Sequence, residues 1–130
     1  YIDELGSTVG DALLATHQSF LRPLEGLLDK GVIKGLAHVT GGGFLENIPR
    51  ILPEGVSVEI NRGTWPELPI FGLMQKLGNV DEKEMFRTFN MGIGMVVIIS
   101  LESLEPVMQH LGICYEIGRV EAGSGQVMIV

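Results

Sequence analysis

Cysteine is nearly absent from the chain, since Cys114 is the single example among 130 residues. One cysteine excludes an internal disulfide, and the lack of a disulfide framework is typical of proteins from a reducing compartment. The apolar neighbour Ile113 favours a buried, inert thiol over a nucleophile. We therefore expect a cytoplasmic protein whose cysteine takes no part in chemistry.

Long hydrophobic runs are missing as well. The longest, Met95–Ile99, is far shorter than the ~20 residues that a membrane-spanning helix needs. Residues 1–5 contain neither the basic segment nor the continuous apolar segment of a signal peptide. We expect no signal peptide and no membrane partner.

Basic residues are scarce, with 9 Lys and Arg against 16 Asp and Glu and a net charge of −7. Proteins that follow a nucleic-acid backbone carry clustered Lys and Arg, whereas these residues are scattered between Arg22 and Arg119. We expect no nucleic-acid partner. A small phosphorylated ligand is still compatible with this charge, in a local pocket of backbone amides and one or two arginines.

Several familiar catalytic patterns are also absent. His17, His38 and His110 show no metal-ligand spacing with one another or with Cys114, so we expect no metal site. The chain has no Gly-x-Ser-x-Gly nucleophile motif. Its acidic residues within 81–84 are typical of a solvated helix start rather than of a catalytic pair.

Glycine, in contrast, is abundant, at 18 of 130 residues against a usual share of about 7%. Gly41, Gly42 and Gly43 stand between an apolar run, 33–39, and a helical pattern, 44–52. At a helix N-terminus such a triplet forms a phosphate cradle of free N–H groups. It serves equally as a tight strand-to-helix turn, and it matches neither the P-loop nor the dinucleotide-binding fingerprint. The triplet alone favours neither interpretation.

The rest of the pattern predicts interleaved helices and strands. Apolar spacing and the residues that start and end helices predict helices at 21–28, from Pro66 to 78 and at 100–112. A further helix is predicted at 44–52, with a kink or end near Pro49, and another begins after a cap at Asn79. Strands are predicted at 32–39, 56–60, 91–100, 115–120 and 126–130, the last two as a hairpin around 123–125. This order predicts an α+β fold, with a mixed sheet and helices packed against it.

Two blocks of the sequence are similar to those of one enzyme family. The first, Ala37–Arg50, reads Ala-His-Val-Thr-Gly-Gly-Gly-Phe-Leu-Glu-Asn-Ile-Pro-Arg, and the second, Met85–Met95, reads Met-Phe-Arg-Thr-Phe-Asn-Met-Gly-Ile-Gly-Met. Between them, Gly63–Pro66 and Pro69–Phe71 also fit. From about Leu13 to its end, the chain resembles phosphoribosylformylglycinamidine cyclo-ligase, also called aminoimidazole ribonucleotide synthetase, of de novo purine biosynthesis.

The resemblance implies a fold, a domain and a reaction. The fold is a three-layer α/β/α domain with partial ferredoxin-like topology, and residues 1–130 are the C-terminal domain of a longer enzyme. The reaction is ATP-dependent closure of formylglycinamidine ribonucleotide to aminoimidazole ribonucleotide. ATP and Mg²⁺ are expected mainly in an N-terminal domain that this chain lacks, with neither bound by the chain alone. The full-length enzyme is expected to be a homodimer, and the isolated chain to be monomeric and inactive.

The same resemblance marks candidate site residues. His38 is the candidate catalytic residue; Thr40, Gly41, Gly42, Gly43, Asn47, Arg50, Asn90 and Gly92 are the candidates for binding substrate or phosphate. The glycines and Arg50 are expected to serve anionic groups, and the histidine and asparagines to orient polar atoms. Each has an ordinary alternative, such as a core histidine, a helix cap, a solvated arginine or close backbone packing.

One stretch departs from the family pattern. Where the family commonly has Pro, Arg and Tyr, this chain has Thr16, Gln18 and Phe20. Gln18 replaces neither the charge nor the fork of an arginine. A stand-alone phosphate- or nucleotide-binding module remains a different interpretation of the chain. Formylglycinamidine synthetase, selenophosphate synthetase and thiamine-phosphate kinase are alternatives within the superfamily, although the two blocks together favour the cyclo-ligase.

Overall fold

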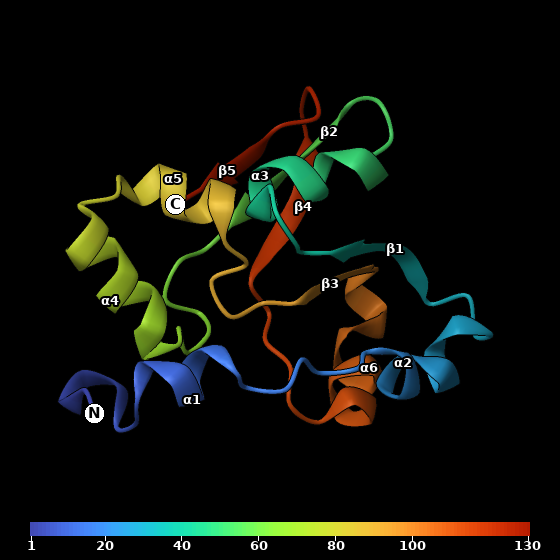
Figure 1. The fold of residues 1–130 in the computed structure, drawn as a ribbon. Coiled ribbons are helices and arrows are strands. Elements are labelled where there is room, and N and C mark those ends of the chain that lie inside the picture. Colours follow the sequence, from blue (N-terminus) through green and yellow to red (C-terminus); the bar gives the residue numbers. More distant parts are fainter.

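A computed structural model describes all residues, 1–130, as short helices and five strands (Figure 1). The α-helices are α1 Val9–Leu13, α2 Leu21–Leu28, α3 Gly43–Asn47, α4 Pro69–Gly78, α5 Glu82–Thr88 and α6 Leu104–Leu111. The strands are β1 Ile33–His38, β2 Val56–Ile60, β3 Met95–Ile99, β4 Gly118–Ala122 and β5 Val127–Ile129. Three 3₁₀ turns, η1 Asp3–Leu5, η2 Pro49–Ile51 and η3 Leu101–Ser103, complete the chain. The α+β class predicted from the sequence is confirmed.

β1 and β3 form an antiparallel ladder that brings the two sequence blocks together. His38 at the end of β1 pairs with Met95 at the start of β3. The N–H of Val39 extends the ladder with a 2.9 Å hydrogen bond to the carbonyl of Gly94. The glycine triplet follows β1, and most of the second block precedes β3. Antiparallel pairing therefore places both blocks at the same end of this ladder.

The other three strands form the mixed sheet, in the order β4-β2-β5. β2 pairs with β4 antiparallel and with β5 parallel, so β4 and β5 do not pair with each other. The predicted hairpin around 123–125 is therefore wrong. The buried hydroxyl of Ser57 in β2 accepts the N–H groups of Ser124 and Gln126 at 3.0 and 3.2 Å. A Cβ on Gly123 would lie 2.0 Å from that hydroxyl, so this glycine allows the loop to pass around β2 rather than to turn back.

The main core joins α3 to α5. Phe44 and Ile48 follow the glycine triplet and are fully buried, as is Met85 of α5, while Phe86 is 2% exposed. Two helices, α3 and α5, pack against each other, and β2 contributes Ile60 to the same cluster. Burial of these large apolar side chains holds the two sequence blocks together.

A smaller apolar contact lies between α2 and α6, below β3 in Figure 1. Leu24, Leu27 and Val107 are buried there, outside the main core cluster. A Cβ on Gly26 would lie 2.6 Å from the ring of His110, so this glycine allows the two helices to approach closely. The apolar spacing at helical period predicted both helices.

Two predicted helix ends differ from the structure. α4 begins at Pro69 rather than at Pro66, because Leu68 is extended (ψ 135°) and proline favours an extended residue before it. Asn79 does not start α5; with φ of 47° it ends α4 in the left-handed conformation that asparagine tolerates. Asp81 caps α5 instead, and its carboxylate accepts a backbone N–H at 2.9 Å.

The chain exposes a large surface for its mass. Only 19 of 130 residues are buried, and the accessible area is 8283 Å². A compact monomer of this mass exposes roughly 6,700 Å². The surplus of about 1,600 Å² exceeds the ~800 Å² that each partner buries in a typical protein–protein interface. Apolar side chains contribute to it, with Leu14 85% and Ile113 90% exposed.

None of the helices combines the length and the apolar character needed to cross a membrane.

Candidate functional site

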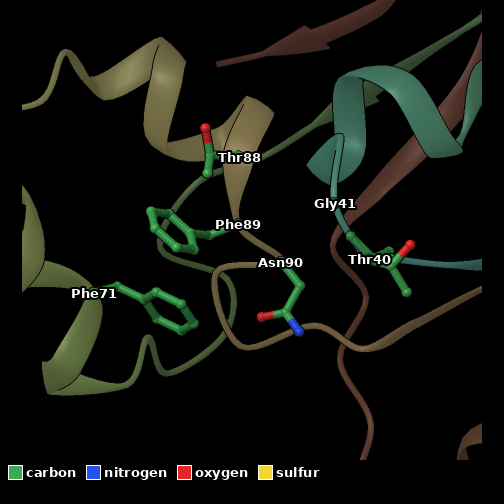
Figure 2. Close-up of a pocket in the computed structure, with 7 residues that line it drawn as sticks. Thr40, Gly41, Phe71, Thr88, Phe89 and Asn90 are labelled. Carbon is green, nitrogen blue, oxygen red and sulfur yellow. The ribbon is translucent and has the colours of Figure 1, made fainter. Parts of the chain in front are cut away.

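A hollow of about 320 Å³ opens where the two sequence blocks meet, and we call it the junction pocket. Its lining residues are Val39, Thr40, Gly41, Phe71, Thr88, Phe89 and Asn90. Figure 2 shows Thr40 and Gly41 across from Asn90, with the rings of Phe71 and Phe89 on the remaining side. The lining offers hydroxyl, amide and aromatic groups but no charged side chain. Such a lining suits an uncharged polar part of a ligand.

The three glycines differ in what surrounds them. Gly43 has φ of 54°, and a Cβ there would lie 2.0 Å from the carbonyl oxygen of Phe86, so packing of α3 on α5 requires glycine. Gly42 has φ of 98° and precedes α3. Gly41 has open space where a Cβ would stand, and it alone of the triplet lines the junction pocket. The N–H groups of Gly41 and Gly42 donate to no acceptor within the chain. Close packing on α5 therefore accounts for Gly43, whose N–H closes a turn onto the Thr40 carbonyl at 2.9 Å. Gly41 and Gly42 are the central residues of that turn, and they also carry the free donors that a ligand needs.

Asn47 holds the glycine loop from behind. Its side chain is buried, and Nδ2 donates to the carbonyls of Thr40, Gly41 and Gly43 at 3.4, 3.2 and 2.9 Å. Its Oδ1 accepts a 3.2 Å hydrogen bond from Arg50. The predicted break at Pro49 is present, because α3 ends at Asn47 and η2 begins at the proline. Neither Asn47 nor Arg50 lines the junction pocket, so their predicted contacts with substrate stay predictions.

The second block makes a tight turn before β3. Asn90 Oδ1 accepts the N–H of Gly92 at 3.0 Å, and its Nδ2 makes no hydrogen bond within the chain. Met91 and Gly92 have φ of 49° and 96°, so the strand predicted from residue 91 begins only at Met95. Asn90 lines the pocket and Gly92 does not. The predicted contacts of Asn90 and Gly92 with substrate stay predictions, and the turn explains the glycine beside Asn90.

His38 lies apart from the junction pocket. The alternative of a core histidine is wrong, since the residue is exposed at the end of β1. Its ring centroid is 5.6 Å from that of His17 and 6.0 Å from that of Phe20. The ring of Phe20 fills the space beside Gly94, where a Cβ would lie 2.5 Å away. The alternation along β1 explains this, because Val39 points inward and its neighbour outward.

An ion pair that the sequence analysis missed also joins the two blocks. Arg87 Nε lies 3.1 Å from Glu46 Oε1. The hydrogen bond to Glu46 raises the pKa of Arg87 above its ordinary value, and the charge of Glu84 adds to the effect, so the guanidinium stays protonated. The Glu46 carboxylate lies against Gly42, where a Cβ would be 2.9 Å from Oε2. An anion at the glycine loop would therefore meet both the carboxylate and Arg87. The place of Arg87 inside the second block was the signal that could have found it.

The chain has no group of three or more His, Cys, Asp or Glu side chains that could hold a metal ion. His17 and His38 come closer than their sequence spacing suggests, but two imidazoles alone do not complete a metal site. No residue of this chain is therefore assigned to a metal.

Comparison with known proteins places the chain. It is similar to proteins named "Phosphoribosylformylglycinamidine cyclo-ligase" from three bacteria. Identity is 49% over 131 residues with that of Caldicellulosiruptor saccharolyticus, covering 98% of this chain and 38% of the relative. It is 46% over 134 residues with that of Bifidobacterium longum subsp. infantis, covering 99% and 39%. It is 48% over 110 residues with that of Acetivibrio thermocellus, covering 85% and 32%. The chain thus spans less than two-fifths of the length of these relatives.

The sequence profile of one family covers almost the whole chain. It is described as "AIR synthase related protein, C-terminal domain" and matches residues 2–130. The two blocks that carry the resemblance lie inside this range, and the fold brings them to one pocket. The chain belongs to the family of AIR synthase related protein C-terminal domains.

Proposed function

We propose that this chain is the C-terminal domain of a phosphoribosylformylglycinamidine cyclo-ligase and that the junction pocket forms one wall of its substrate site. One observation carries the proposal. Residues 40–41 and 88–90, far apart in sequence, line the same hollow and come from the two blocks that resemble the cyclo-ligase. Relatives with that name are 46% to 49% identical over almost the whole chain.

The reaction of such an enzyme closes a ring within one substrate molecule. ATP supplies the phosphoryl group that turns the formyl amide oxygen of formylglycinamidine ribonucleotide into a leaving group. The amidine nitrogen then attacks the activated carbon, and the products are aminoimidazole ribonucleotide, ADP and phosphate. Because nucleophile and electrophile belong to the same molecule, a wall that fixes their relative orientation lowers the barrier by several kcal/mol.

The pocket lining suits the uncharged part of that substrate. The free Nδ2 of Asn90, the free N–H of Gly41 and the hydroxyl of Thr40 offer hydrogen bonds to amide or hydroxyl groups. We assign the anionic part to the N–H groups of Gly41 and Gly42 together with Arg50 and Arg87. Arg87 also offsets the nearby Glu46 carboxylate.

Several of the candidate site residues do not line the junction pocket, and we propose other roles for them. We propose that Asn47 and Gly43 act by shaping the loop, and Gly92 by allowing the turn after Asn90. A proton-transfer role for His38 requires that substrate reach beyond the junction pocket, on the exposed side of β1. We retain His38 as a candidate on this condition.

The larger assembly is part of the same proposal. About three-fifths of the relatives' length has no counterpart in this chain, which leaves room for an N-terminal ATP-binding domain. In keeping with the family resemblance, we place ATP and Mg²⁺ mainly in that domain. The surplus exposed area supports docking of such a domain. We further propose a homodimeric, cytoplasmic enzyme.

A direct experiment compares the isolated chain with the full-length protein in an assay for aminoimidazole ribonucleotide. We expect formation of product, dependent on ATP and Mg²⁺, with the full-length protein and none with the isolated chain. Cyclisation by the isolated chain would contradict the proposal that the reaction also needs an N-terminal ATP-binding domain. Absence of product with a folded full-length protein would contradict the proposed reaction.

Calorimetric titration of the isolated chain separates this proposal from a stand-alone binding module. ATP, inorganic phosphate and ribose 5-phosphate serve as probes. We expect at most weak binding, because the pocket is one open wall. Tight binding of any probe by the chain alone would favour the module.

A further inference from the structure

Trp65 lies outside the junction pocket but contacts both sequence blocks. It is the chain's single tryptophan and is 4% exposed. Its ring centroid lies 5.7 Å from that of Phe44, the residue directly after the glycine triplet. Its indole Nε1 donates a buried hydrogen bond of 2.9 Å to the carbonyl of Met91, directly after Asn90. One side chain therefore bridges the elements that form the two facing sides of the pocket.

The hydrogen bond ends at an unusual backbone position. Met91 has φ of 49°, in the left-handed region that residues other than glycine, asparagine and aspartate rarely adopt. Its own side chain is 4% exposed, so the residue has little freedom to move outward. A conformation of this kind persists only where neighbouring groups hold it. The indole of Trp65 supplies such a support from the core side.

The orientation of Asn90 depends on the same turn. Its Oδ1 accepts the N–H of Gly92, and its carbonyl accepts the N–H of Ile93 at 2.9 Å. Both donors follow Met91 in sequence. If Met91 left the left-handed region, both N–H groups would move and Asn90 would lose the contacts that leave its Nδ2 free at the pocket.

We propose that Trp65 is a positioning residue, whose indole N–H holds Met91 in the left-handed conformation and thereby fixes Asn90 opposite Thr40 and Gly41. The contribution to substrate binding rests on the function proposed above, whereas the positioning of Asn90 does not. If Trp65 only filled space in the core, the volume of its ring would be sufficient. The positioning role needs the N–H group.

Two substitutions separate these roles. Trp65→Phe keeps an aromatic ring beside Phe44 but removes the donor to the Met91 carbonyl. Met91→Gly places at φ of 49° a residue that adopts this conformation without support. If Trp65 acts through the backbone of Met91, the second change restores the position of Asn90 in the double variant. If Trp65 only fills the core, the second change adds to the damage, because it removes another buried side chain.

The test uses ¹H–¹⁵N NMR spectra of this 130-residue chain. We expect Trp65→Phe to shift or broaden the side-chain Nδ2 signals of Asn90 and the backbone signal of Gly92. The control Val107→Ala also truncates a buried residue, but in the α2–α6 contact outside the main core. It should leave both signals in place. We expect the double variant Trp65→Phe/Met91→Gly to return the Asn90 signals toward the wild-type positions. Unchanged Asn90 signals in Trp65→Phe, or a double variant no closer to wild type than the single one, would overturn the proposal.

Kinetics of the full-length protein provide the second readout. Trp65→Phe should lower kcat/KM roughly tenfold or more, with partial recovery in the double variant, because small misplacements of orienting groups have effects of this size. Val107→Ala should leave it near the wild-type value. If the NMR signals of Asn90 move while kcat/KM does not, positioning by Trp65 stands and the assignment of Asn90 to substrate fails.

Discussion

At the scale of single residues, Gly41 and Gly43 belong to the same glycine triplet but differ in whether a larger residue can replace them. A Cβ at Gly43 would lie 2.0 Å from the Phe86 carbonyl oxygen, and φ of 54° disfavours any other residue. We expect Gly43→Ala to lower the free energy of unfolding by about 2 to 4 kcal/mol. The measurement is urea denaturation of the isolated chain. The matched control is Gly41→Ala, which meets open space and should change stability by less than about 0.5 kcal/mol. Equal stabilities for the two variants would refute this account of the triplet.

The two asparagines of the site form a second matched pair. Asn47→Asp exchanges a donor for a carboxylate that faces the carbonyls of Thr40, Gly41 and Gly43. A buried group that loses its partners and gains unfavourable ones costs about 2 to 4 kcal/mol, visible as a lower midpoint in thermal or urea unfolding. Asn90→Asp keeps the Oδ1 that accepts the Gly92 N–H, so its unfolding midpoint should stay close to wild type. If Asn47→Asp unfolds at the wild-type midpoint, the asparagine does not hold the loop.

Among the elements, β5 depends on Ser57 more than on a turn of its own. The Ser57 hydroxyl accepts the N–H groups of Ser124 and Gln126, which lead into β5. Ser57→Ala leaves both donors without this acceptor, and we expect a loss of roughly 1 to 3 kcal/mol. Amide hydrogen exchange should accelerate at residues 124–129 before it does so in β1 and β3. The control Ser103→Ala removes a hydroxyl that is hydrogen-bonded to Ser100 and should leave β5 unchanged. Uniform acceleration across both sheets would contradict a local role.

Local patterns predicted most elements but not how the strands pair. The alternation at 56–60 and the helical spacing at 21–28 and 100–112 are properties of neighbouring residues, so β2 and α2 lie where the sequence placed them. The last predicted helix is present as η3 followed by α6. The loop at 123–125 reads as a hairpin turn, yet Gly123 is required by its approach to Ser57, 66 positions earlier in the chain. A contact between distant residues leaves no trace in local periodicity.

The candidate site was likewise predicted in part from local sequence patterns, and the rest of it depends on contacts between distant residues. The residues of both blocks were singled out from the sequence, and Thr40, Gly41 and Asn90 do line one pocket. The pairing of β1 with β3 explains why the blocks meet, and this pairing could not be read from their separate motifs. Phe71, Thr88 and Phe89 were not among the candidates, because aromatic and hydroxyl side chains in a helix or directly after one are ordinarily structural. The exposed position of His38 was missed because an apolar run suggests a strand buried on both faces.

At the scale of the whole molecule, we propose that the chain is one wall of a site that another domain completes. Its exposed area and the fraction of the relatives that it spans both support this view. The most direct test of the central claim measures kcat/KM for ring closure by the full-length protein carrying Asn90→Asp, beside the wild type and a surface control, Lys30→Gln. The substitution replaces the free Nδ2 donor by a charged acceptor, so it should lower kcat/KM at least roughly tenfold, with folding intact and the control unaffected. An Asn90→Asp enzyme with wild-type kcat/KM would show that the junction pocket does not meet the substrate.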